Sequence, residues 1–143
     1  RGADYGRTLD DAVANANADV ATVVQMETTG AIDDADAIAA LDGLDALFVG
    51  PADLSARLGD FGAFDTDAFR ASVDTVVDAA STAQGSVAVG TLATSPENAT
   101  PRREDWGMDF VVAGVDVAYL RDGLTGYLDA LDGEDAASVG GGD

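Results

Sequence analysis

The stretch Val-Val-Gln-Met-Glu-Thr at residues 23–28, followed by Leu-Phe-Val-Gly-Pro-Ala-Asp-Leu-Ser at residues 47–55, decides the fold of this chain. Glu27 and Asp53 each come after a run of β-branched or bulky apolar residues. Such runs are typical of buried parallel strands, so both carboxylates are expected at the carboxyl ends of strands. In α/β folds, ligands bind at that edge.

The residues around the two carboxylates favour a binding site. Gln25 lies two residues before Glu27 and therefore points to the same side of its strand. Residues 50–52, Gly-Pro-Ala, predict a tight corner with few side-chain atoms, whose backbone N–H groups are free to face an anion. The alternative is structural: Asp53 caps a helical turn beginning at Leu54, and Glu27 faces solvent.

The segments Gln-Met-Glu-Thr at 25–28 and Gly-Leu-Asp-Ala-Leu-Phe-Val-Gly-Pro-Ala-Asp-Leu-Ser at 43–55, with Gly59, resemble the HpcH/HpaI aldolase family of class II pyruvate aldolases. The resemblance runs from residue 1 to about residue 131 and matches only the second half of a family member. It implies a (β/α)8 TIM barrel in the α/β class, of which residues 1–132 supply the last four strand-helix units.

The resemblance also implies a carbon–carbon lyase that cleaves 4-hydroxy-2-oxo acids, such as 2-keto-3-deoxy sugar acids, to pyruvate and an aldehyde through a metal-stabilised enolate. In the family, the residues matching Glu27 and Asp53 hold a divalent metal ion, Mg²⁺ or Mn²⁺, and two carboxylates make the oxygen site that such ions prefer. The implied substrate-binding residues are Gln25, Gly50, Pro51, Ala52, Asp53 and Ser55. The catalytic His and Arg of the family have no counterpart in this segment and are expected upstream.

Two other functions stay open. The related citrate lyase β-subunit and malyl-CoA lyase group shares the barrel and the metal site, although the Gly-Pro-Ala-Asp-Leu-Ser corner is more similar to the aldolases. The other alternative is a non-catalytic half-barrel remnant that binds a metal ion or a 2-oxo acid, or serves only in assembly. A Schiff-base aldolase needs a lysine, and the sequence contains none.

Acidic residues dominate the composition: 27 Asp and Glu stand against seven Arg, for a formal net charge of -20 at pH 7. This charge disfavours nucleic acid and anionic membranes as partners. The Asp residues are scattered over the expected helices and loops, which fits a halophilic, cytoplasmic protein that stays soluble at high salt. With no Cys and no His, the segment has neither thiolate ligands nor imidazole catalysis.

The beginning of the chain and its apolar runs carry two further expectations. No apolar run is long enough to span a membrane. The sequence begins at Arg1 without a signal-peptide pattern, which suggests that it starts partway through a gene product. In its full-length form the protein is expected to be a homo-oligomer that acts on a small-molecule 2-oxo acid.

Four strand-helix units in succession predict an all-parallel sheet with right-handed crossovers. Strands are expected at 20–26, 46–49, 86–89 and 110–113, and helices at 9–18, 31–40 and 66–84, then from 95 and in the last unit up to residue 131. Such a sheet is either open and doubly wound or part of a barrel, and the resemblance selects the barrel. A half barrel has two free edge strands and a half-covered core.

The segments between these elements have their own expectations. Residues 54–64 predict an irregular excursion and a candidate lid, and residues 90–94 predict a small-residue loop. Pro101 removes a helical hydrogen bond, so the helix around it is expected to start late or to kink. Residues 133–143 are expected to form a disordered acidic and Gly-rich tail.

Three side-chain types in the last third of the chain also have assignments. For Arg102 and Arg103, anion binding is the alternative to the expected place on a solvated face, paired with some of the 27 acidic residues. Trp106 is expected to pack rather than to bind substrate. Asp116, another acid at a strand end, is ranked first as a helix cap and second as a site residue.

We expect the folded state to require molar salt, because the many carboxylates repel one another when screening is weak. Far-UV circular dichroism melts in low and in molar salt measure this requirement. A sharp melt that persists in low-salt buffer would contradict the halophilic interpretation.

Overall fold

The computed structural model describes residues 5–138, with side chains described up to residue 131 except for residue 17. Along the described chain, each strand is followed by one or two helices. Their order is α1 (Leu9–Asp19), β1 (Val23–Met26), α2 (Thr29–Asp33), α3 (Ala35–Ala39), β2 (Ala46–Val49), α4 (Pro51–Arg57), α5 (Asp67–Thr82), β3 (Ala88–Ala93), α6 (Pro96–Asp105), β4 (Phe110–Ala113) and α7 (Asp116–Ser138).

The four strands form one parallel sheet in the order β1-β2-β3-β4. Val49 pairs with Met26 on one side and with Thr91 on the other, so β1 and β2 end level with each other while β3 continues to Ala93. Each strand neighbours the next one in sequence, without the reversal of order that a doubly wound sheet contains. The predicted α/β class is confirmed, and this strand order is that of consecutive barrel strands.

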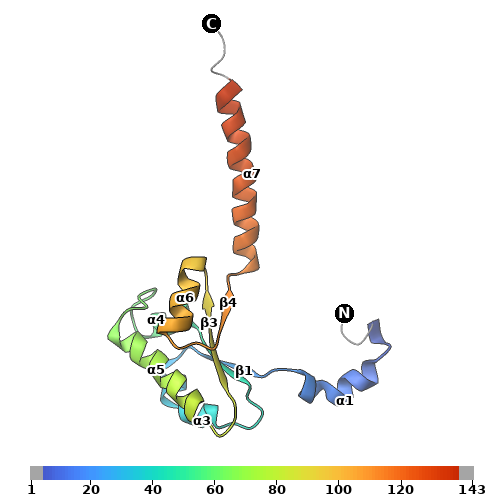
Figure 1. Ribbon diagram of the computed structural model, residues 1–143, viewed down its shortest axis with the longest axis vertical. Coiled ribbons are helices and arrows are strands. Elements are labelled where there is room, and N and C mark those ends of the chain that lie inside the picture. The colour runs from blue at the N-terminus through green and yellow to red at the C-terminus, as the bar shows by residue number, and fades with distance from the viewer. Residues whose placement is uncertain (1–4, 139–143) are drawn as a thin grey trace.

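Helices cover one face of the sheet, where the core lies. Figure 1 shows α3, α5 and α6 on the same side of the strands. Apolar residues of the strands and of α5 belong to one buried cluster, which includes Met26, Leu47, Val49, Val89, Phe69, Val73 and Val76. The cap of α5 is Thr66, whose side chain accepts a hydrogen bond from the Phe69 backbone N–H. The helices therefore hold the strands in place through one face of the sheet only.

Within residues 5–138, no helix covers the opposite face of the sheet in this way. It carries the alternate residues of each strand, among them Val23 and Val112, which are 48% and 44% exposed. The rings of Phe48 and Phe110 lie on this face with 6.3 Å between their centroids. In a closed barrel this face would be the interior, so the half-covered core expected for a half barrel is present.

Gly90 lies beneath the ring of Phe110. A Cβ at this position would stand 2.2 Å from Phe110 Cζ, so only glycine fits without a shift of the ring. The strand β3 continues through Gly90 to Ala93, and the loop predicted at 90–94 is therefore wrong. Gly90 is small because the Phe110 ring covers it, and pairing with β2 and β4 on both sides keeps this stretch extended.

Two further expectations about local structure are corrected. The irregular stretch predicted at 54–64 begins as helix, since α4 runs from Pro51 to Arg57. The helix α6 begins at Pro96 and contains Pro101, so it does not start late. The carbonyl that Pro101 leaves without a helical donor is that of Glu97, an exposed residue in the first turn.

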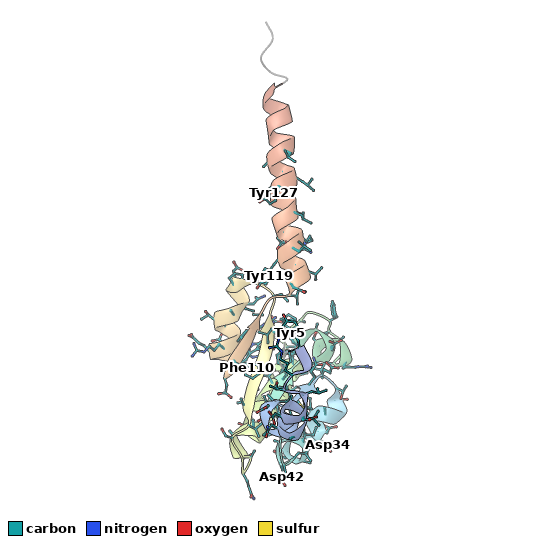
Figure 2. All side chains as sticks on the ribbon, turned by 90° about the vertical axis from the view of Figure 1, so that its right-hand side faces the viewer. Tyr5, Asp34, Asp42, Phe110, Tyr119 and Tyr127 are labelled. Atoms are coloured by element: carbon teal, nitrogen blue, oxygen red, sulfur yellow. The ribbon has the colours of Figure 1, made fainter. Side chains whose placement is uncertain are left out.

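The last helix, α7, extends away from the sheet (Figures 1 and 2). Its apolar stripe is exposed and consists of Leu120, Leu124, Tyr127, Leu128 and Leu131. The helix continues to Ser138, into the range predicted as a tail, and residues 139–143 lie outside the described residues. None of the helices in the described residues combines the length and the apolar character that a membrane span needs.

Replacement of Gly90 tests the contact with Phe110. Gly90→Ala is expected to lower the free energy of unfolding by about 1–3 kcal/mol, because the added methyl group overpacks the face of the sheet. Gly85→Ala is the matched control, since its Cβ would meet no atom within 4 Å. Denaturant unfolding at constant salt measures both variants. An equal loss for Gly90→Ala in a Phe110→Ala background would show that the ring is not the cause.

Candidate functional site

The two strand ends bring Glu27 and the Gly50 corner together. Glu27 follows β1 directly and is half-buried. A Cβ at Gly50 would stand 3.1 Å from Glu27 Oε2 and 3.3 Å from its Cβ, so the side chain of Glu27 lies against the corner backbone. The Gly50 N–H donates to the Met26 carbonyl over 3.3 Å and ties the corner to the end of β1. Glycine at position 50 therefore makes room for the carboxylate.

The corner opens the helix α4. Gly50 is the N-cap, and Pro51 stands in the first turn, so the helix does not begin at Leu54 and Asp53 is not its cap. Asp53 is exposed in that first turn. Among the described residues, the carboxylates of Glu27 and Asp53 have no hydrogen-bond or ion-pair partner. Both are free to bind a ligand.

A cavity of about 210 Å³ opens at this edge of the sheet. Segments from three strand-helix units line it: Gln25 and Phe48 from the strands, the corner residues Gly50, Pro51, Ala52 and Asp53, then Phe64, Leu92, Thr94, Asn98 and Arg102. Gln25 and Phe48 pair across β1 and β2, so their side chains share the open face of the sheet. The cavity joins that face to the helical corner.

Most of the residues expected to bind substrate lie together at this cavity, namely Gln25, Gly50, Pro51, Ala52 and Asp53. Ser55 does not. Its side chain is 1% exposed, its hydroxyl donates to the Ala52 carbonyl over 2.9 Å, and it accepts from the Gly62 N–H over 3.0 Å. Ser55 therefore ties the corner to the segment after α4 instead of facing the cavity.

The donor set fits a hard divalent cation. The described residues hold no group of three or more Asp, Glu, His or Cys arranged as a metal site. Glu27 and Asp53 alone flank the corner, with oxygen donors only. Mg²⁺ is commonly held by one or two carboxylates and completes its shell with water and substrate oxygens. The residues present would suit such an ion.

Arg102 lines this cavity, whereas the sequence interpretation ranked anion binding by Arg102 below a place on a solvated face. It is 5% exposed, and within the described residues no carboxylate pairs with it, so its expected place on a solvated face is wrong. Its guanidinium lies over the rings of Phe64 and Trp106, at 5.1 Å and 5.0 Å from their centroids. Trp106 is buried in the core, which confirms its packing role.

The spacing along α6 carried a signal for this cluster. Asn98, Arg102 and Trp106 follow one another at intervals of four residues, which places them on one face of a helix. Burial lowers the pKa of the Arg102 guanidinium below its usual value, through desolvation of the charge. Asp116 is the first residue of α7 and not its cap, because Val115 accepts the first helical hydrogen bonds, from Ala118 and Tyr119; the Asp116 Oδ1 accepts from the Val117 N–H over 2.7 Å.

Known proteins with related sequences give these residues a context. The family model of HpcH/HpaI aldolase/citrate lyase matches residues 3–123. A hydroxypyruvate/pyruvate aldolase of Chromohalobacter salexigens is 39% identical over 114 residues, 79% of this chain and 43% of that protein. A 5-keto-4-deoxy-D-glucarate aldolase of Escherichia coli is 37% identical over 125 residues, 87% of this chain and 47% of that protein.

The fold has a counterpart among solved structures. The crystal structure of an HpcH/HpaI aldolase/citrate lyase family protein from Burkholderia cenocepacia matches with a TM-score of 0.73 and 34% sequence identity. The match covers 88% of this chain and 50% of that chain. The chain spans about half the length of the curated relatives it matches.

Ser55→Ala tests the link between the corner and the segment after α4. The variant leaves the Gly62 N–H without its acceptor, so we expect faster hydrogen exchange at that amide and a loss of about 1 kcal/mol of stability. Ser81→Ala, which removes a local bond to the Asp78 carbonyl on α5, is the matched control. Unchanged exchange of the Gly62 amide in Ser55→Ala would contradict this role.

Proposed function

The chain belongs to the HpcH/HpaI aldolase/citrate lyase family, and on that premise we propose that it carries the oxo-acid end of a metal-dependent aldolase site. The reaction proposed is cleavage of a 4-hydroxy-2-oxo acid to pyruvate and an aldehyde. The four parallel strand-helix units correspond to about half of a family TIM barrel. The observation that carries the proposal is the cavity lined by Gln25 and the Gly50 to Asp53 corner, with Glu27 against Gly50.

The corner is suited to hold the carboxylate of a 2-oxo acid. Leu54 donates its N–H to the Gly50 carbonyl, whereas the N–H groups of Ala52 and Asp53 precede the first helical hydrogen bond and have no acceptor in α4. Both residues line the cavity. We assign these two N–H groups to the substrate carboxylate and the Gln25 side chain to orientation of the oxo acid from the neighbouring strand.

Glu27 and Asp53 are the residues that would hold Mg²⁺ or Mn²⁺. When bound, such an ion supplies Lewis-acid stabilisation of the negative charge that develops on the substrate oxygens. The two carboxylates would offer negative charge to the ion and fix its place at the C-terminal edge of the sheet. Neither carboxylate is engaged by another described residue. Their arrangement supports binding of a chelating oxo acid.

The contribution of this chain is proposed to be binding and orientation. Cleavage also needs a base for the C4 hydroxyl proton, and a positioned base typically contributes about 10²–10⁴-fold. Among the described residues that line the cavity, Asp53 is the carboxylate, and it is assigned to the cation. We therefore propose that the base for the C4 hydroxyl proton comes from a residue outside this cavity lining.

Two observations favour an aldolase over a citrate lyase type of enzyme. The relatives at 39% and 37% identity are named as aldolases that act on hydroxypyruvate and pyruvate or on 5-keto-4-deoxy-D-glucarate. The Gly-Pro-Ala-Asp-Leu-Ser corner supports the same choice. We also propose a homo-oligomer in a salt-rich cytoplasm, which the exposed apolar stripe of α7 and the net charge of -20 support.

Asp53→Asn and Glu27→Gln test the cation site. Each keeps the side-chain size but removes a charge, so we expect Mg²⁺ affinity to fall roughly tenfold or more, since a contact to a charged group is worth about 1.5–3 kcal/mol. Magnesium-dependent binding of oxalate should fall with it. Isothermal titration calorimetry measures both.

Asp60→Asn is the matched control, because Asp60 is exposed and does not line the cavity. It should leave both titrations unchanged. Equal Mg²⁺ affinity in Asp53→Asn and the original protein would remove Asp53 from the site, and an absence of magnesium-dependent oxalate binding to folded protein would overturn the proposed function.

A further inference from the structure

The segment between α4 and α5 carries Phe64 into the wall of the candidate site. Phe64 is half-buried and packs against the apolar core. Two hydrogen bonds tie this segment to α4: the Gly62 N–H donates to Ser55 Oγ over 3.0 Å, and the Asp60 N–H donates to the Ser55 carbonyl over 3.0 Å. Because α4 begins at the oxo-acid corner, these bonds hold the segment of Phe64 in place relative to that corner.

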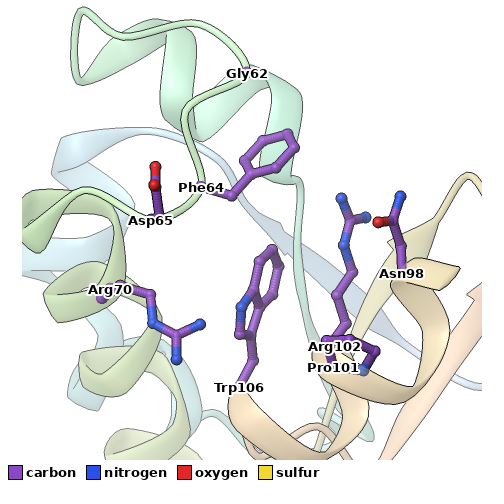
Figure 3. Close-up of a pocket in the computed structure, with 8 residues that line it drawn as sticks. All are labelled: Gly62, Phe64, Asp65, Arg70, Asn98, Pro101, Arg102 and Trp106. Atoms are coloured by element: carbon purple, nitrogen blue, oxygen red, sulfur yellow. The ribbon is translucent and has the colours of Figure 1, made fainter.

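Three side chains fix the position of the Phe64 ring. Its centroid lies 5.4 Å from that of Phe69 and 6.1 Å from that of Trp106, which meets it edge-on. The Arg102 guanidinium lies 5.1 Å from the same centroid and is itself anchored, because Nη1 donates to the Leu92 carbonyl. Figure 3 shows the Phe64 ring above Trp106, with the Arg102 guanidinium to one side of both. Aromatic pairs and cation–π contacts both favour such an arrangement, so the ring has one preferred place.

This ring stands between two cavities. The cavity of about 210 Å³ contains the Gly50 to Asp53 corner, and a cavity of about 570 Å³ opens beside Trp106. Phe64, Asn98 and Arg102 line both of them. Asn98 and Arg102 come from α6, whereas Phe64 reaches the boundary from the segment before α5. The ring therefore completes the partition between the oxo-acid corner and the larger space.

Packing alone does not explain a ring in this position. Protein interiors are close-packed, and a side chain that serves only the core is surrounded by other atoms. Phe69 is such a residue, because it is 0% exposed and belongs to the buried cluster. Phe64 is half-buried and borders empty space on two sides. Its position is explained by what it separates.

We propose that Phe64 is a specificity-determining residue whose ring limits the chain length of the 2-oxo acid that the site accepts. This inference rests on the proposed function, which places the oxo acid group at the Gly50 to Asp53 corner. A chain that extends from the corner toward α6 meets the ring, and the ring cannot move aside without losing its contacts with Phe69, Trp106 and Arg102. The accepted ligands are therefore short 2-oxo acids, and the larger cavity stays closed to them.

The experiment compares pyruvate, 2-oxopentanoate and 2-oxooctanoate by calorimetric titration of the full chain, in Mg²⁺ at one salt concentration. The original protein is expected to bind 2-oxooctanoate more weakly than the two shorter acids. Phe64→Ala should raise the affinity for 2-oxooctanoate relative to pyruvate about tenfold or more, since burial of two methylene groups in the larger cavity supplies such a factor. Phe61→Ala is the matched control, because Phe61 lies on the same segment, is 77% exposed and lines neither cavity.

The fluorescence of Trp106 gives a second reading of the same samples. The sequence contains one tryptophan, and Trp106 lines the larger cavity but not the smaller one. In Phe64→Ala, 2-oxooctanoate should change the Trp106 emission, because its chain enters the larger cavity, whereas pyruvate should not. In the original protein neither acid should change it. A loss of stability alone produces no such dependence on the length of the ligand.

Phe64→Leu keeps an apolar side chain of smaller size, and it should shift the affinity ratio in the same direction if Phe64→Ala does not fold. An original protein that binds 2-oxooctanoate as tightly as pyruvate would overturn the inference while leaving the proposed function intact. An unchanged ratio in a folded Phe64 variant would do the same. Equal losses for both acids would assign Phe64 to structure only. Failure of the original protein to bind any of the three acids in Mg²⁺ would refute the proposed function itself.

Discussion

The in-register pairing of β1 with β2 is the constraint on which the candidate site depends. It sets Met26 beside Val49, so that the next residues, Glu27 and Gly50, meet at the edge of the sheet. The end of β2 is held in turn by Thr91, whose buried hydroxyl donates to the Val49 carbonyl over 2.9 Å. A slip of one residue in either strand would turn the side chains to opposite faces and separate the carboxylate from the corner.

The two faces of the sheet divide structure from chemistry. The helix-covered face holds the apolar cluster of strands and α5, while the other face holds Gln25, Phe48 and Phe110, with no helix of the described part of the chain against them. Around the C-terminal half of α6 the division is less sharp, because the rings of Phe64, Phe69 and Trp106 contact one another and the Arg102 guanidinium lies over two of them, Phe64 and Trp106. Core packing there orients a charged side chain toward the cavity.

Local sequence patterns were sufficient to predict those strands whose own residues show a clear apolar run. The strands at 46–49 and 110–113 agree with the structure, and so does the gathering of Gln25 and Asp53 at one edge. The extent of β3 was not predictable in this way, since Gly90 and Thr91 belong to a strand only because β2 and β4 bond it from both sides. Arg102 and Ser55 were misassigned for a related reason: their burial depends on Phe64, Trp106 and Gly62, which come from other segments.

The junction between β4 and α7 has a mechanical consequence. Gly114 has a φ of 67°, and a Cβ there would stand 2.2 Å from the hydroxyl oxygen of Tyr119, which donates to the Ala113 carbonyl over 2.7 Å. These contacts at residues 113–119 therefore set the direction of α7. Packing along the helix does not, because its apolar stripe is exposed. Because α7 runs from Asp116 to Ser138, a small change of backbone angle at Gly114 displaces the distant leucines much more than the first turn. The backbone at Gly114 therefore sets the geometry of any assembly that uses this stripe.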